Sequence, residues 1–135
     1  MATEPKILLV DDEENILRSM EKSLFREGFD VETATGNVDA MALMQAALQA
    51  GEPFDLVIID LNMPDFEGKE SRYAGLELLE RIKKTAPKTP VIANSAWDEV
   101  ETAKKCIDKG ATDYFVKGRN TEMIQKIKAV LRLED

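Results

Sequence analysis

The fold is decided by residues 54–64, which read Phe-Asp-Leu-Val-Ile-Ile-Asp-Leu-Asn-Met-Pro. An apolar, β-branched run that closes on one carboxylate, Asp60, and then enters a proline-bearing loop is typical of a buried central strand. Open α/β folds place their sites at the carboxyl edge of such a sheet. Asp60 is therefore expected at a functional site.

A second acidic cluster has the same setting. Residues 7–10, Ile-Leu-Leu-Val, run directly into the four acidic residues 11–14. If the two strands are neighbours, Asp11, Asp12 and Asp60 meet in one crevice. At about 5 Å and an effective dielectric near 20, each like-charged pair costs roughly 3 kcal/mol. A hard cation with oxygen ligands relieves this repulsion, and Mg²⁺ prefers one or two carboxylates together with waters and phosphate.

The length, net charge and cysteine count of the chain exclude several classes of function. The chain has 135 residues, which suits a single domain, and we expect residues 1–135 to form one with no effector domain. A formal net charge of −8 argues against direct binding of nucleic acid or an anionic membrane. The single cysteine, Cys106, excludes an internal disulfide, and no signal peptide or membrane span is evident. These features predict a cytoplasmic protein.

The chain contains no histidine. This excludes Ser-His-Asp and Cys-His catalysis, histidine-ligated zinc, and a phosphohistidine on this chain. Any chemistry must come from Asp, Glu, Ser, Lys and a metal ion.

Strand-like and helix-like segments alternate, which predicts an α/β fold with a doubly wound, five-stranded parallel sheet and right-handed crossovers. Residues 65–74 stand out as a long polar loop. The strands are expected at 6–10, 29–34, 55–59, 91–93 and 113–117, and the helices at 14–27, 38–50, 75–85, 97–109 and in a closing helix capped by Asn120.

The ends of these strands carry a set of complementary groups. Asp11 and Asp12 follow the first strand, Asp60 the third, Ser95 the fourth and Lys117 the fifth. This set suits aspartyl-phosphate chemistry, with Asp60 as nucleophile and the first two aspartates as Mg²⁺ ligands. Lys117 and Ser95 would bind the remaining phosphoryl oxygens.

Each residue taken alone also has a structural explanation. Asp11 and Asp12 could cap the helix that follows, as Glu13 and Glu14 are expected to do. Asp60 could simply stabilise a turn through its side chain, and Ser95 could be a helix N-cap. Lys117 could be a solvated strand end. The agreement of four strand ends favours the site.

These residues resemble the receiver domain of two-component response regulators over nearly the whole chain. The resemblance implies a flavodoxin-like (βα)5 fold with strand order 2-1-3-4-5. The matching strings are Ile-Leu-Leu-Val-Asp-Asp-Glu at 7–13, Asp-Leu-Val-Ile-Ile-Asp-Leu-Asn-Met-Pro at 55–64, Pro-Val-Ile at 90–92, Ser-Ala at 95–96 and Lys-Gly-Ala-Thr-Asp-Tyr-Phe-Val-Lys at 109–117.

The resemblance also implies roles at the metal and phosphate site. Asp60 would accept a phosphoryl group from a sensor histidine kinase or a histidine phosphotransfer protein. Asp12, Asp60 and the Asn62 carbonyl would bind Mg²⁺, with Mn²⁺ as a substitute, while Asp11 would act through water. Such a domain is not an enzyme in the usual sense, since it catalyses only its own phosphorylation and autodephosphorylation.

The same resemblance implies a switch. Ser95 would turn toward the phosphoryl group as Tyr114 swings inward, which remodels the face made by the fourth helix, fifth strand and fifth helix. That face would bind a downstream protein, an effector domain or a second copy of the chain. Asn62 and Trp97 stand at positions that influence the rate of phosphate loss, and a bulky indole at Trp97 predicts slow loss.

Several residues depart from the family pattern. Gly118 replaces the usual proline, so we expect a trans 117–118 peptide and a less certain reach for Lys117. Residues 69–75 look like an insertion, because Gly68 or Gly75 could be the family's glycine. The insertion is either a tolerated surface feature or a device that tunes kinase choice or phosphate lifetime. Asn94 replaces an apolar residue and has no explanation in the sequence.

Three rival interpretations fit these residues less well. A haloacid-dehalogenase-type phosphatase would need a second aspartate where Asn62 stands, and flavin binding would need a hydroxyl- and glycine-rich loop where residues 11–14 are acidic. The third is a degenerate receiver that acts as an unphosphorylated interaction adaptor. The output, the cognate kinase and the length of the native protein are not encoded in these residues.

Overall fold

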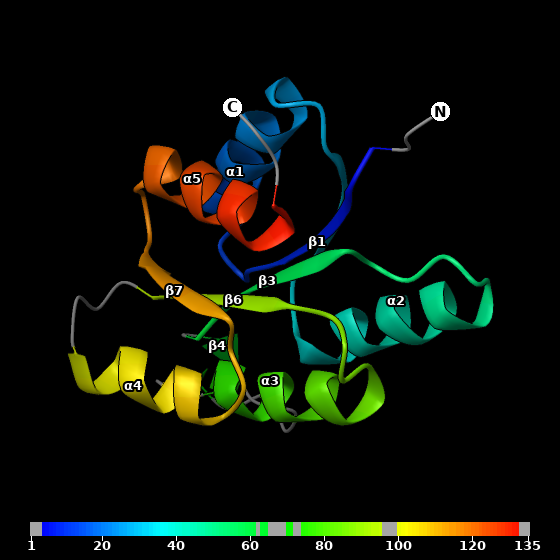
Figure 1. Ribbon diagram of the computed structural model, residues 1–135. Coiled ribbons are helices and arrows are strands. Elements are labelled where there is room, and N and C mark those ends of the chain that lie inside the picture. The colour runs from blue at the N-terminus through cyan, green and yellow to red at the C-terminus, as the bar shows by residue number, and fades with distance from the viewer. Residues whose placement is uncertain (1–3, 62, 65–69, 72–73, 96–99, 133–135) are drawn as a thin grey trace.

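The computed structural model describes residues 4–61, 63–64, 70–71, 74–95 and 100–132. Strands and helices alternate along the chain, as the sequence predicts (Figure 1). The elements are β1 (Lys6–Val10), α1 (Glu14–Arg26), β2 (Asp30–Ala34), α2 (Asn37–Gln49), β3 (Leu56–Asp60), β4 (Met63–Pro64), β5 (Glu70–Ser71), α3 (Ala74–Thr85), β6 (Val91–Ser95), α4 (Val100–Asp108), β7 (Asp113–Val116) and α5 (Asn120–Leu131).

The main sheet has the order β2-β1-β3-β6-β7, and every pairing in it is parallel. Because β4 and β5 lie outside this sheet, the order corresponds to the predicted 2-1-3-4-5, which is confirmed. All five residues of β3 are buried, as expected of a central strand covered on both faces. Full burial of each Val or Ile in it contributes roughly 1.5–3 kcal/mol.

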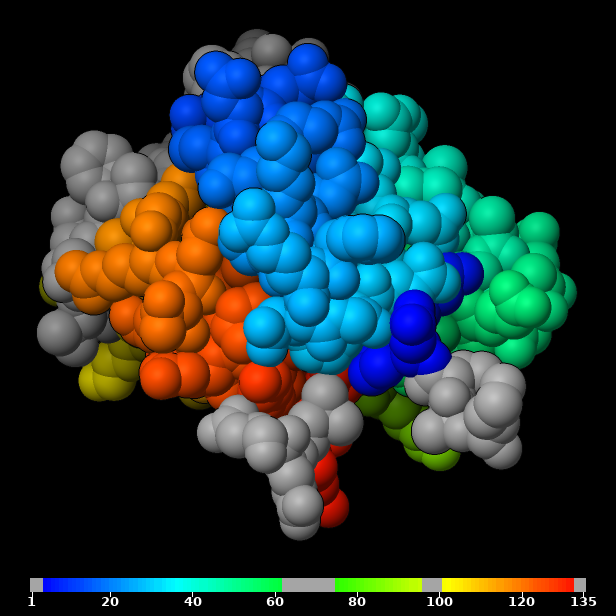
Figure 2. Space-filling view, turned by 90° about the horizontal axis from the view of Figure 1, so that it is seen from above, coloured from blue at the N-terminus to red at the C-terminus, as the bar shows by residue number. Residues whose placement is uncertain are grey.

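Helices cover both faces of the sheet. Helices α1 and α5 lie on one face, and α2, α3 and α4 lie on the other (Figure 1). The strands follow the period of two, so that Ile58 and Ile92 join the apolar cluster under α1 and α5, while Ile59 joins the opposite cluster. Figure 2 looks onto the first face, where α1, in blue, lies beside α5, in orange and red.

The segment between β3 and α3 differs from the predicted loop. Strands β4 and β5 pair antiparallel, with Met63 opposite Ser71 and Pro64 opposite Glu70. The polar composition of this segment hides the short ladder, because two-residue strands carry no periodic signal. The remainder of the proposed insertion, residues 69 and 72–73, and the alternative glycine Gly68 lie outside the described residues.

Two helix details also correct the sequence analysis. The helical spacing of Val100, Ala103 and Ile107 in the sequence predicts that these three residues face inward. In α4, however, Ile107 is 48% exposed, whereas Thr102 and Cys106 are buried. Asn120 is the first residue of α5 and not its N-cap, which is Arg119. Its side-chain amide donates to Ser23 Oγ at 3.1 Å and so links α5 to α1.

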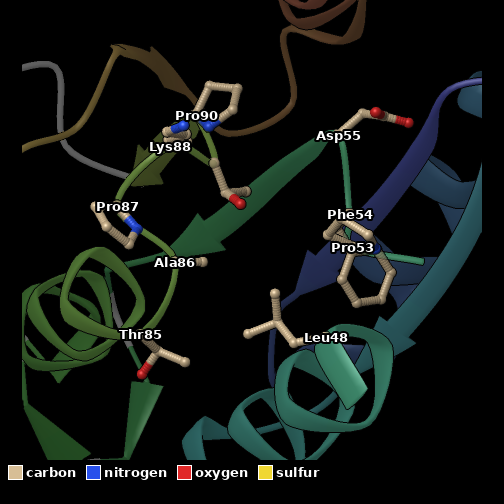
Figure 3. Close-up of a pocket in the computed structure, with 10 residues that line it drawn as sticks. Leu48, Pro53, Phe54, Asp55, Thr85, Ala86, Pro87, Lys88 and Pro90 are labelled. Carbon is tan, nitrogen blue, oxygen red and sulfur yellow. The ribbon is translucent and has the colours of Figure 1, made fainter. Parts of the chain in front are cut away.

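A pocket of about 490 Å³ lies at the amino edge of the sheet, far along the strands from the acidic residues. Leu48 of α2 and Phe54, just before β3, line it together with the turn between α3 and β6 (Figure 3). Its one carboxylate, Asp55, accepts a hydrogen bond from the Lys6 backbone N–H at 2.8 Å. Within the described ranges, no helix is long and apolar enough to cross a bilayer.

Candidate functional site

The polar residues predicted from the strand ends do gather at the carboxyl edge of the sheet. Asp60 and Ser95 are the last residues of β3 and β6, and Asp11 follows β1, where its N–H donates to Ala34 O at 3.1 Å. All three are fully buried. The prediction that these groups meet holds because parallel strands end at one edge of the sheet.

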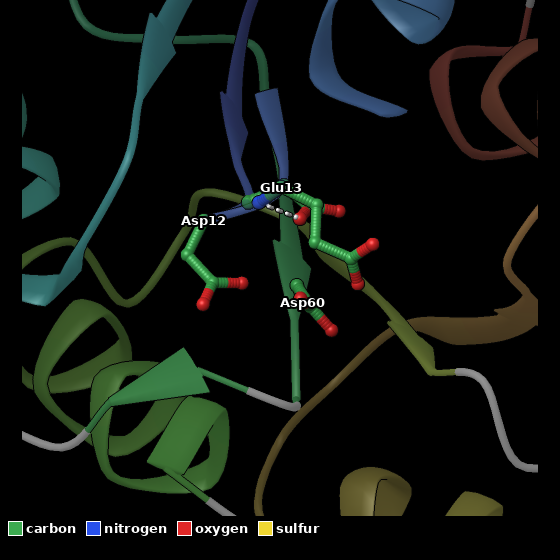
Figure 4. Close-up of side chains that lie close together, drawn as sticks. Asp12, Glu13 and Asp60 are labelled. Atoms are coloured by element: carbon green, nitrogen blue, oxygen red, sulfur yellow. Dashed lines mark hydrogen bonds between the residues drawn. The ribbon is translucent and has the colours of Figure 1, made fainter. Parts of the chain in front are cut away.

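Four carboxylates converge there. One oxygen from each of Asp11, Asp12, Glu13 and Asp60 lies within 4.8 Å of the other three. Figure 4 shows Asp12 and Glu13 at the turn after β1, close to Asp60 at the end of β3. Asp11 Oδ1 accepts the Glu13 backbone N–H at 2.9 Å, which fixes the turn.

This donor set fits a hard divalent cation. Asp12 Oδ1 is buried and has no hydrogen-bonding partner in the part of the chain that the structure describes. A buried carboxylate oxygen without a partner is costly, and a cation with oxygen ligands removes that cost. The fourth predicted ligand, Asn62, lies outside the described residues.

Lys117 provides the positive charge of the cluster. Its Nζ lies 2.8 Å from Asp60 Oδ2, 3.0 Å from Glu13 Oε1 and 3.3 Å from Asp11 Oδ2. Burial lowers the pKa of Lys117, but the hydrogen bond and charge of Asp60, and then the charge of Asp11, outweigh it and raise the pKa above its usual value. The ammonium is therefore charged at neutral pH, and one cation faces four carboxylates.

Asp11 shows the opposing effects of burial and charge on a carboxylate. Burial raises its pKa, while the Glu13 backbone N–H and the charge of Lys117 lower it, and the net shift is upward. Lys117 and the Glu13 N–H therefore do not fully compensate for burial of the ionised Asp11 carboxylate. A further cation in the site would stabilise this ionised form.

Glu13 belongs to the cluster, although sequence reasoning assigned it only to the start of α1. It is the N-cap residue by position but makes no side-chain capping bond. Its carboxylate turns instead to Lys117, 104 residues further along the chain. No local pattern predicts this pairing, because it depends on the Lys117 side chain reaching from the end of β7 past β6 and β3 to the turn after β1.

Ser95 and Tyr114 lie on the neighbouring strands β6 and β7. Ser95 O accepts the Lys117 backbone N–H at 2.9 Å, so the end of β6 positions the residue that carries the ammonium. Tyr114 is partly buried and packs against the apolar cluster on the α2, α3 and α4 face. Trp97 lies outside the described residues.

Two glycines shape the edge of the site. The 117–118 peptide is trans, as predicted, and Gly118 has φ +88°. Lys117 nevertheless reaches Asp60. A Cβ added to Gly75 would lie 2.5 Å from the Asp60 carbonyl oxygen, so only glycine lets α3 begin against the end of β3.

A doubly wound sheet with a buried aspartate, an acidic cluster and a lysine at one edge defines a class of phosphoacceptor-type α/β domains. The model of the response regulator receiver domain matches residues 7–128, and the chain belongs to that family. Membership removes the ground for the phosphatase and flavin-binding interpretations.

Individual proteins agree with this assignment. The chain is 34% identical over 127 residues to the uncharacterized transcriptional regulatory protein YkoG of Bacillus subtilis, covering 93% of this chain and 50% of that protein. It is 31% identical to the transcriptional regulatory protein PrrA of Mycobacterium tuberculosis, covering 96% and 51%. The chain thus spans about half the length of these curated relatives.

Solved structures give the same fold. A CheY-like receiver domain protein from Methanospirillum hungatei superposes with a TM-score of 0.80 at 30% identity, covering 96% of this chain and 95% of that one. The chemotaxis response regulator CheY4 of Vibrio cholerae superposes with a TM-score of 0.79 at 27% identity, covering 95% and 99%. The similarity extends over both chains nearly end to end.

Proposed function

We propose that this chain is a receiver that accepts a phosphoryl group on Asp60 from a phosphohistidine of a sensor kinase or a histidine phosphotransfer protein. The observation that carries the proposal is the buried Asp60 carboxylate, 2.8 Å from the Lys117 ammonium and within a cluster of four carboxylates. Since these 135 residues contain no histidine, the donor imidazole lies outside them.

Asp12 and Asp60 are the residues that would hold Mg²⁺ directly, with Asp11 through water and the Asn62 carbonyl as a further ligand. When bound, the ion supplies charge neutralisation for the phosphoryl oxygens. The orphaned Asp12 Oδ1 supports this assignment, and Mn²⁺ satisfies the same oxygen-donor chemistry.

The transfer itself is a displacement at phosphorus. An oxygen of the Asp60 carboxylate attacks, the bond from phosphorus to the imidazole nitrogen breaks, and its electron pair stays on the imidazole. Lys117 donates to a phosphoryl oxygen as it leaves Asp60 Oδ2, and Ser95 donates to another. These groups position and stabilise charge, which is what phosphoryl transfer chiefly requires.

The output would be a change of surface. Turning of Ser95 toward the phosphoryl group would vacate space beside Tyr114 and so alter the face formed by α4, β7 and α5. That face would bind a downstream protein, an effector domain or a second copy of the chain, and Ile107 on α4 is an exposed apolar residue of one of its elements. Asn62 and Trp97 would tune the lifetime of the phosphate.

The rest of the proposal concerns residues 1–135 as a unit. Residues 1–135 form a single receiver domain that works in the cytoplasm, binds neither nucleic acid nor membrane itself, and catalyses only its own phosphorylation and dephosphorylation. The alternative is a degenerate receiver that keeps the fold and binds partners without being phosphorylated.

The two functions are separated by incubation with a small acyl phosphate in the presence and absence of Mg²⁺, followed by intact-mass analysis. The wild type should gain the mass of one phosphoryl group only when the metal is present, and Asp60→Asn should gain none. A wild type that stays unlabelled under both conditions would identify the adaptor.

A further inference from the structure

Asn94 lies at the carboxyl edge of the sheet, and the proposed function gives it no role. It is the residue before the last in β6, and its side chain is fully buried. Neither its Oδ1 nor its Nδ2 has a hydrogen-bonding partner within the described ranges. A buried amide with both polar atoms unpaired opposes folding, and an apolar side chain of the same shape would not.

The register places this amide beside the phosphoacceptor. Asp60 and Asn94 are paired residues of the adjacent parallel strands β3 and β6, so their Cα atoms are separated by roughly the 4.8 Å strand spacing. Both side chains point to the face under α1 and α5, because each follows by two residues an isoleucine, Ile58 or Ile92, of that apolar cluster.

On its other side in the sheet Asn94 is paired with an apolar residue. Phe115 of β7 is its partner on the second side and is buried in the apolar cluster. The backbone oxygen of Asn94 accepts a hydrogen bond from the Leu61 N–H at 2.9 Å. The Asp60 carboxyl group is therefore the polar group that a rotation of the Asn94 side chain brings within hydrogen-bonding reach.

We propose that the Asn94 side-chain N–H donates a hydrogen bond to the Asp60 carboxyl group of the aspartyl phosphate and thereby accelerates loss of the phosphate. The inference rests on the proposed function. In the present structure Lys117 occupies Asp60 Oδ2 at 2.8 Å. Once Lys117 turns to the phosphoryl oxygens, the ammonium no longer lies against the Asp60 carboxyl group, and Asn94 on the paired strand carries an N–H that can donate to it.

Hydrolysis needs such a donor at this place. Water attacks phosphorus and gives up a proton to solvent, the bond from phosphorus to the Asp60 oxygen breaks, and inorganic phosphate leaves. The electron pair of that bond stays on Asp60, so negative charge grows on its carboxyl group in the transition state. An N–H that donates to this group stabilises the growing charge.

The test compares Asn94→Thr with Asn94→Val. The two side chains have the same shape and both suit a strand, but only threonine carries a hydroxyl donor. Each protein is labelled with an acyl phosphate and Mg²⁺, the donor is removed, and the decay of the phosphorylated mass is followed. We expect decay about tenfold slower in Asn94→Val, equivalent to ~1.4 kcal/mol of barrier, and close to wild type in Asn94→Thr.

Two further readouts separate this role from a structural one. Asn94→Val should melt at a higher temperature than wild type, and the infrared carbonyl band of its aspartyl phosphate should lie at higher frequency for want of a hydrogen bond. Thr89→Val is the control, since Thr89 is a buried polar residue at the amino edge. It should decay at the wild-type rate.

Equal decay of Asn94→Val, Asn94→Thr and wild type would overturn the inference and leave the proposed function intact. A wild type that cannot be labelled at all would overturn both.

Discussion

Lys117 and Asp60 form a buried ion pair at the carboxyl edge of the sheet, with Nζ 2.8 Å from Oδ2 and side chains only 7% and 0% exposed. The lysine arrives from the end of β7 and the aspartate from β3, with β6 between them in the sheet. The Lys117 side chain therefore crosses β6, and its ammonium lies next to the buried Asp60 carboxylate. It acts as the internal counterion of the acidic cluster.

Replacing Lys117 by methionine should destabilise the metal-free protein by about 3 kcal/mol, because four carboxylates then share one crevice without the ammonium that pairs with three of them. Urea unfolding in the presence of a chelator measures this change. Lys126→Met is the control, since its ion pair with Asp113 is partly exposed and should cost less than about 1 kcal/mol. Adding Mg²⁺ should restore part of the lost stability of Lys117→Met. Equal stability of Lys117→Met and wild type would contradict the counterion role.

Glu13→Gln should weaken Mg²⁺ binding roughly fivefold at low salt and less at high salt, because one negative charge near the cation is removed. The change is measured by titration calorimetry at two salt concentrations. Glu14→Gln is the matched control, since Glu14 is paired with Arg18 on the surface of α1. If both variants bind Mg²⁺ like the wild type, Glu13 does not belong to the site.

Gly118→Pro should destabilise the protein by more than about 1 kcal/mol, although proline is the residue the family pattern would supply. Proline locks φ near −65°, whereas Gly118 has φ +88°. Gly118→Ala should also cost about 1 kcal/mol, since the left-handed region is unfavourable for alanine. A stable, fully folded Gly118→Pro would show that this loop readily takes the other conformation.

Cys106 should make stability fall above pH 9. Burial raises the pKa of this thiol to about 11 from its ordinary value of 9.0. A raised pKa means that the native state favours the protonated thiol, so its contribution is complete below pH 9 and is lost as the pH rises through 11. The slope is about 1.4 kcal/mol per pH unit in this window.

The measurement is urea unfolding from pH 8 to 11 for wild type and Cys106→Ala, in which this part of the slope should vanish. An alkylating reagent should label folded wild type at pH 8 far more slowly than the unfolded chain. Rapid labelling of the folded protein would show that Cys106 is accessible.

The order of elements was predictable because apolar runs and glycine or proline stops alternate clearly along the chain. The C-terminal end of β6 was not predictable. Asn94 and Ser95 extend that strand by two residues beyond the predicted 91–93, since polar residues buried at a strand end look like loop. In α4 the bulky Ile107 was expected inward, but the smaller Thr102 and Cys106 are buried instead. Periodicity alone could not choose between these two stripes in so short a helix.

The site was predictable where chain topology determines it. Asp11, Asp60, Ser95 and Lys117 end or follow parallel strands, so their meeting follows from the sheet. The pairing of Glu13 with Lys117 and the orphaned amide of Asn94 were not, because they depend on rotamers and strand register. Both features still lie beside Asp60, where departures from ordinary packing rules are expected to serve function.

The central claim is that the reactive oxygen belongs to Asp60 and to no other carboxylate of the cluster. After phosphorylation with an acyl phosphate and Mg²⁺, borohydride reduces an aspartyl phosphate to homoserine, and peptide mass analysis locates the altered residue. We expect homoserine at position 60, and none when Mg²⁺ is withheld. Homoserine at position 11 or 12, or an unmodified residue 60 in phosphorylated protein, would contradict the account.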